Sequence, residues 1–122
     1  MTAHDLDTFL EAYIECALWS STDNADDTGG APLDDNYGPA DLSPSCLASM
    51  TKDCRDFVSA NLVDLAGLDE SQAGHDFWLT RNGHGAGFWD RGLGEIGRRL
   101  TDACRPYGSV DLYVGDDGQI HS

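Results

Sequence analysis

Three acidic residues near the start of the chain, Asp7, Glu11 and Glu15, are spaced four residues apart. In an α-helix this spacing places side chains on one face, with a rise of about 6 Å between successive carboxylates. Successive phosphates along one DNA strand have a similar separation, so this acidic ladder could occupy the phosphate-binding pockets of a nucleic-acid-binding protein. An ordinary solvated helix face is the alternative. The ladder has a cost, because like charges at this spacing destabilise a helix by roughly 0.2–0.5 kcal/mol per pair.

The segment 20–42 adds six aspartates within a stretch rich in Gly, Pro and Ser. A connection this long in a small domain is usually functional or disordered. We expect an ordered acidic loop that Leu33 and Tyr37 hold against the body of the protein. The ladder and the loop together make up the predicted partner-binding surface, which consists of Asp7, Glu11, Glu15, Asp23, Asp26, Asp27, Asp34, Asp35 and Asp41.

The charge of the chain is distributed unevenly. The first 51 residues contain 10 carboxylates and no Lys or Arg, whereas the remainder holds 12 acids and 7 bases, and the formal net charge is −15. Such a field repels nucleic acids and anionic membranes, and it attracts basic partners. Proteins that receive a polyanion are themselves basic. Halophilic adaptation is an alternative for a chain with 18 Asp, 4 Glu and one Lys, but it does not explain why only the second part carries bases.

A second group of reactive side chains surrounds the glycine-rich run at 82–87. His75, Asp76, His84 and Asp90 could bind a divalent metal ion or form a general acid–base pair. The glycines would let backbone amides approach an anion, although the run lacks the Lys-Ser/Thr ending of a Walker loop. We favour a structural hairpin with His84 at its tip, and we assign no catalytic, cofactor-binding or metal-binding residue. The alternative is a small metal-dependent or acid–base enzyme centred on His75, His84 and Asp90.

Hydrophobic periodicity predicts three helices, at 4–19, 43–66 and about 93–104. Residues 76–81 are expected to form a strand, because the Asn-Gly pair at 82–83 is a strong hairpin signal. The aromatic pairs at 77–78 and 88–89 would then lie on the paired strands, and residues 110–120 would form a second hairpin. The predicted fold class is α+β, with three helices packed on one face of a small, three- to four-stranded antiparallel sheet.

We expect a single domain over residues 1–122. It would comprise an N-terminal acidic helical part at about 1–73 and a C-terminal hairpin, helix and hairpin part at about 74–122. The four cysteines are scattered, without a C-x-x-C pair or an export signal before them. They are therefore expected to be reduced and buried thiols, at Cys16, Cys46, Cys54 and Cys104.

Three stretches of the sequence support a resemblance to known proteins. They are GHDFWLTRNGHGAGFWDRG at 74–92, ALWSS at 17–21 and DLYVG at 111–115. Together they resemble small uncharacterised acidic proteins encoded by bacteriophages and plasmids, a family without an assigned activity. Mobile elements commonly carry small acidic inhibitors of host defence, so the resemblance implies a DNA-mimicking anti-CRISPR or anti-restriction protein.

The expected function is non-enzymatic inhibition of a host nucleic-acid-binding defence complex, by DNA mimicry through the acidic surface. Electrostatics would steer association, while apolar anchors such as Trp19, Leu33 or Tyr37 would supply affinity. The expected partner is a basic CRISPR effector or restriction enzyme, and no cofactor, nucleic acid or membrane is expected to bind. The chain shows no signal peptide or membrane-spanning run, which predicts a protein of the bacterial cytoplasm, as a monomer or small homo-oligomer.

Overall fold

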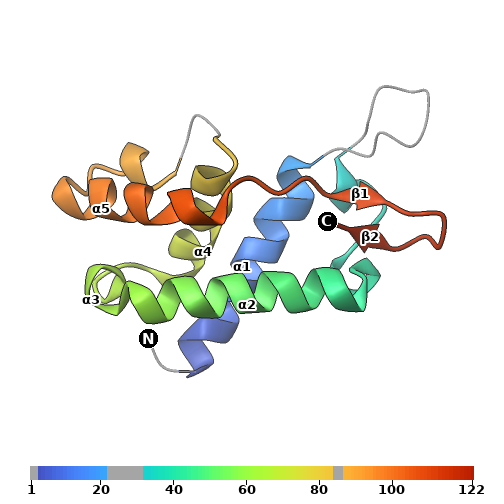
Figure 1. Ribbon diagram of the computed structural model, residues 1–122, viewed down its shortest axis with the longest axis horizontal. Coiled ribbons are helices and arrows are strands. Elements are labelled where there is room, and N and C mark those ends of the chain that lie inside the picture. The colour runs from blue at the N-terminus through green and yellow to red at the C-terminus, as the bar shows by residue number, and fades with distance from the viewer. Residues whose placement is uncertain (1–2, 22–31, 84–86) are drawn as a thin grey trace.

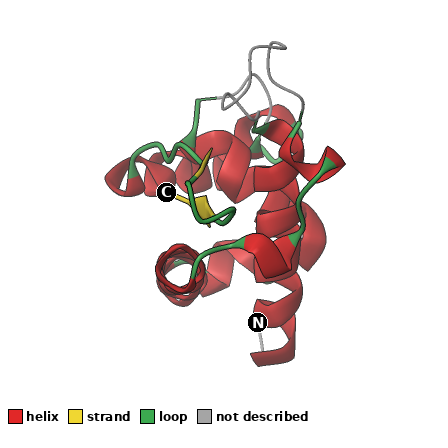
Figure 2. Cartoon of the chain, turned by 90° about the vertical axis from the view of Figure 1, so that its right-hand side faces the viewer, coloured by secondary structure: helices red, strands yellow, loops and turns green. Residues whose placement is uncertain are grey.

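The computed structural model describes residues 3–21, 32–83 and 87–122. Within these ranges the chain forms five α-helices, four short 3-10 turns and one two-stranded antiparallel sheet (Figures 1 and 2). The helices are α1 (Ala3–Ser20), α2 (Pro44–Ala60), α3 (Leu62–Leu65), α4 (Glu70–Arg81) and α5 (Glu95–Cys104). The 3-10 turns are η1 (Leu33–Asp35), η2 (Pro39–Asp41), η3 (Phe88–Asp90) and η4 (Arg105–Tyr107), and the strands are β1 (Tyr113–Val114) and β2 (Ile120–His121).

The predicted fold class, three helices on one face of a three- to four-stranded antiparallel sheet, is wrong. The described chain is mostly helical, and the segment expected to begin the first hairpin lies inside α4. Asp69 caps this helix by accepting a hydrogen bond from the backbone N–H of Gln72 at 2.9 Å. The buried residues Ala73, Phe77 and Arg81 follow at the four-residue spacing of one helix face. A short apolar run of this kind does not distinguish a strand from a buried helix.

The Asn82-Gly83 pair ends α4 instead of turning a hairpin. The Asn82 side chain donates to the carbonyl oxygen of Trp78 at 2.9 Å, and the N–H of Gly83 donates to Thr80. Gly83 has a φ of 70°, the left-handed conformation that commonly closes a helix. Hairpin turns and helix ends both use a glycine with positive φ, so an Asn-Gly pair alone does not show which of the two structures forms. The expected return strand is also wrong, because Phe88 and Trp89 lie in η3.

The remaining elements agree more closely with the sequence. Helix α1 covers the predicted 4–19, α5 lies within 93–104, and β1 and β2 pair Tyr113 with His121. The Ser43 hydroxyl accepts a hydrogen bond from the N–H of Cys46 at 3.1 Å, which confirms the predicted start of α2. The predicted helix 43–66 is interrupted at Asn61, whose φ of −126° and ψ of 27° separate α2 from α3.

Helix α1 lies at the centre of the molecule, where it crosses α2 and packs along α4 (Figure 1). Phe9 and Tyr13 of α1 are fully buried among aromatic rings of the other two helices. The Phe77 ring lies 6.0 Å from that of Phe9 and 4.2 Å from that of Phe57, in a stacked arrangement with the latter. Because α1 and α4 share this core, residues from both predicted parts of the chain pack together.

All four cysteines are free and buried. Burial raises the pKa of Cys16 to about 11 and that of Cys104 to about 12, and it also raises the pKa of Cys54. Since the thiolate is the reactive species, we expect no rapid reaction with a disulfide reagent such as DTNB at neutral pH. All four thiols should react once the protein is unfolded in denaturant. A fast-reacting thiol in the native protein would contradict this expectation.

Candidate partner-binding surface

Helix α1 exposes one narrow row of side chains. Between residues 5 and 20, the exposed positions are Asp7, Glu11, Glu15 and Trp19, each four residues after the last. The rest of this part of the helix is buried or half-buried, because α2, α4 and η1 pack around it. The acidic ladder is therefore the solvent-facing edge of a core helix, and it continues into a tryptophan that is 63% exposed.

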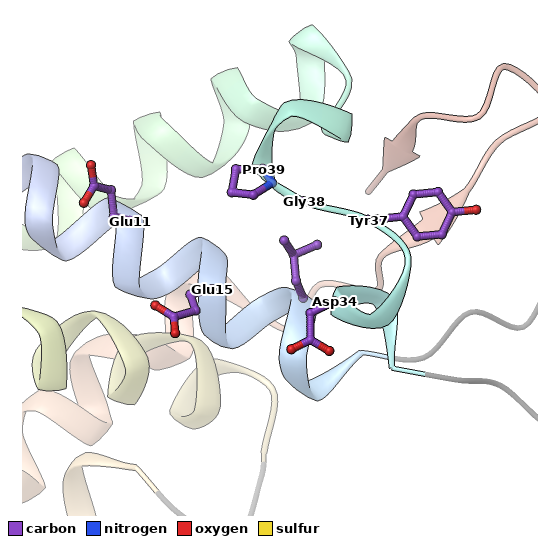
Figure 3. A pocket seen from close by; sticks show the side chains of 7 residues that line it. Glu11, Glu15, Asp34, Tyr37, Gly38 and Pro39 are labelled. Atoms are coloured by element: carbon purple, nitrogen blue, oxygen red, sulfur yellow. The ribbon is translucent and has the colours of Figure 1, made fainter.

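A groove runs beside this row, and we call it the acidic groove. Its first part has a volume of about 510 Å³ and lies between α1 and the η1–η2 segment (Figure 3). Its second part, of about 320 Å³, lies towards α4. The carboxylates of Glu15 and Asp34 line both parts, so the two depressions adjoin. The remaining residues that matter for its chemistry are Glu11, Leu18, Tyr37 and Pro39 in the first part, and Trp19 and His75 in the second.

Residues 32–43 are held beside α1 by the core. Leu33 is 1% exposed, and its N–H donates to the carbonyl oxygen of Ser21 at 2.9 Å. The N–H of Tyr37 donates to the backbone carbonyl oxygen of Leu33, and the N–H of Ser43 donates to that of Ile120 in β2. The expectation that Leu33 holds this part of the loop is confirmed. The same burial makes Leu33 unsuitable as an anchor for a partner, whereas Trp19 and the half-buried Tyr37 remain accessible.

The basic residues neutralise other parts of the molecule. Arg81 pairs with Asp53 at 2.9 Å, and Arg99 pairs with Asp64 at 2.7 Å. The other ion pairs are Lys52–Asp56, Arg91–Asp76, Arg98–Glu95, Arg99–Glu95, Arg105–Asp102 and His121–Asp117. None of these pairs reaches the ladder or η1, so no ion pair between described residues neutralises the carboxylates of the acidic groove.

The structure divides the predicted partner-binding residues into four groups. Glu11, Glu15 and Asp34 line the acidic groove together. Asp7 and Asp35 are exposed near it without lining it. Asp41 accepts a hydrogen bond from the N–H of Gly38 at 2.8 Å and so stabilises its own turn. Three predicted residues lie outside the described part of the chain, and these are Asp23, Asp26 and Asp27.

The hairpin that was to carry the alternative enzyme site is absent from the described residues. His75 lies in the middle of α4 and lines the acidic groove, whereas Asp90 is exposed in η3. Asp76 is 2% exposed and accepts hydrogen bonds from Arg91 at 3.0 and 3.1 Å. This carboxylate therefore holds η3 against α4. His84 lies outside the described residues, and within those residues no group of three or more His, Cys, Asp or Glu could hold a metal ion.

His75 belongs to α4 and not to the predicted hairpin, and Trp19 is a further exposed position of the ladder face that the predicted surface does not include. The position of Trp19 was readable, because it continues the four-residue spacing of Asp7, Glu11 and Glu15. The arrival of His75 beside Glu15 had no local signal, since it depends on how α4 packs against α1.

Comparisons of the chain with protein-family models, with curated proteins and with solved structures found no match. None of the helices in the described ranges combines the length and apolar character needed to cross a membrane.

Proposed function

We propose that this protein is a non-enzymatic inhibitor that occupies the DNA-binding site of a basic host protein. The observation that carries the proposal is the uncompensated row formed by Asp7, Glu11 and Glu15, with Asp34 beside it, on a molecule whose ion pairs lie elsewhere in the described chain. The partner class is a nucleic-acid-binding defence complex such as a CRISPR effector or a restriction enzyme. That narrower assignment comes from the resemblance of the sequence to proteins of bacteriophages and plasmids.

The two kinds of side chain on this surface have different roles in binding. The carboxylates attract the cationic partner and orient it, which chiefly raises the association rate. Exposed aromatic side chains contribute most of the binding free energy once water is excluded. Trp19, at the end of the row, is such a side chain. Because exposed charges are screened beyond about 8–10 Å at physiological ionic strength, association should slow strongly as salt is added.

The decisive experiment is competition with DNA after capture from a host lysate. Proteins retained by the immobilised chain at low salt are eluted with high salt, identified, and assayed for binding of labelled duplex DNA. We expect the captured protein to bind DNA and the free chain to displace it. The triple variant Glu11→Lys, Glu15→Lys, Asp34→Lys should compete at least about tenfold less well, because the charges that meet the cationic cleft are reversed.

A matched control separates this surface from the net charge of the protein. The variant Asp90→Lys, Asp111→Lys, Asp116→Lys reverses three exposed carboxylates away from the groove, so its net charge changes by the same amount. We expect this control to compete within about threefold of the original protein. Equal loss in both variants, or captured proteins whose DNA binding is unaffected, would reject the proposal. Unfolding of the original protein at low salt would indicate halophilic adaptation instead.

A further inference from the structure

The acidic groove combines an apolar floor with a negative rim. Leu18, which is 3% exposed, lines it from α1, and Pro39 lies opposite α1, whereas the Tyr37 ring points away from Glu11 and Glu15 (Figure 3). Glu15 of α1 and Asp34 of η1 line the same depression and add their carboxylates to it. An occupant must therefore bring positive charge to the rim and aliphatic surface to the floor. Long basic side chains have both, because their charged end is carried on a methylene stem.

We propose that the acidic groove is a receptor for an arginine side chain on the surface of the basic partner. The guanidinium lies between Glu15 and Asp34, and its stem covers Leu18. This inference rests on the proposed function and specifies what the groove recognises. The charge of the groove supports a basic occupant, since its carboxylates have no basic partner among the described residues.

Two features favour arginine over lysine. The planar guanidinium has several N–H donors and can donate to two carboxylates at once, whereas the lysine ammonium acts as a point charge. Guanidinium groups also stack on indole rings. Trp19 lies beside Glu15 and Asp34 in the second part of the groove, with most of its ring in solvent. A phosphate-like surface that only attracted charge would not distinguish the two side chains.

The test uses two short blocked peptides, one of alternating glycine and arginine, the other with lysine in place of each arginine. Dissociation constants are measured by NMR titration of the protein at low ionic strength. We expect the arginine peptide to bind at least about fivefold more tightly. Glu15→Gln or Asp34→Asn should each weaken its binding by about tenfold, through loss of a charge-assisted hydrogen bond.

The matched controls are Asp111→Asn and Asp35→Asn, which remove the same charge from exposed positions outside the groove lining. We expect them to weaken binding by less than about twofold. Equal affinity for the two peptides, or equal weakening by Asp34→Asn and Asp35→Asn, would overturn the arginine receptor. In that case the protein would still compete with DNA, and the triple charge-reversed variant would still compete less well. Failure of this inference is therefore distinguishable from failure of the proposed function.

Discussion

Replacing Arg81 with alanine is expected to lower the free energy of unfolding by about 3–5 kcal/mol. The Arg81 side chain is 2% exposed, and its guanidinium donates to Asp53 at 2.9 Å and to the Tyr13 hydroxyl at 3.0 Å. It also donates to the backbone carbonyls of Tyr107 at 2.8 Å and Gly108 at 2.9 Å. Removal of the donor leaves these acceptors unsatisfied in or near the core, which costs more than the hydrogen bonds contributed.

Urea unfolding followed by circular dichroism measures this loss. Arg98→Ala is the control, because its pair with Glu95 is exposed on both sides and should contribute less than about 1 kcal/mol. Arg81→Lys should fall between the two, since lysine keeps the charge without the fork of donors. If Arg81→Ala and Arg98→Ala had the same free energy of unfolding, the hydrogen bonds of Arg81 would not be needed for the fold.

Gly74→Ala is expected to cost about 3 kcal/mol, near the upper end for overpacking a core. A Cβ atom at Gly74 would lie 2.2 Å from the backbone oxygen of Phe9 and 3.1 Å from the Cβ of Ala12. Neither contact can be relieved by rotating a side chain, so α1 and α4 would have to separate. The missing side chain at Gly74 is therefore what allows the two helices to approach.

The comparison for this prediction is Gly67→Ala, where an added Cβ would meet nothing within 4 Å. We expect that variant to be unchanged or more stable by up to about 1 kcal/mol, through reduced freedom of the unfolded chain. Thermal unfolding of both variants measures the difference. Equal melting temperatures would contradict the close crossing of α1 and α4. A displaced α4 would also move His75 in the wall of the acidic groove, so partner binding should weaken together with stability.

Some elements were predictable because their signals are local. The apolar residues of α1 recur every three to four positions, and the Ser43 hydroxyl caps α2 by accepting from the N–H of Cys46, three residues along the chain. Both signals are therefore contained in a short stretch of sequence. Helix α4 was missed because its buried residues include the adjacent pair Phe77 and Trp78, which does not mark a single face. Neighbours cover α4 on more than one side, so its sequence does not show the usual amphipathic pattern.

The sign of the charge, its concentration before Lys52 and the four-residue spacing of the ladder follow from the order of the residues alone. Which carboxylates remain without an ion pair depends on how the helices pack. Arg99 reaches Asp64 and Arg81 reaches Asp53 across segments far apart in the chain, and neither turns towards the ladder. The burial of Leu33 likewise brings Asp34 to Glu15. Spacing along a helix follows from backbone geometry, whereas these pairings follow from how the helices bury their apolar faces.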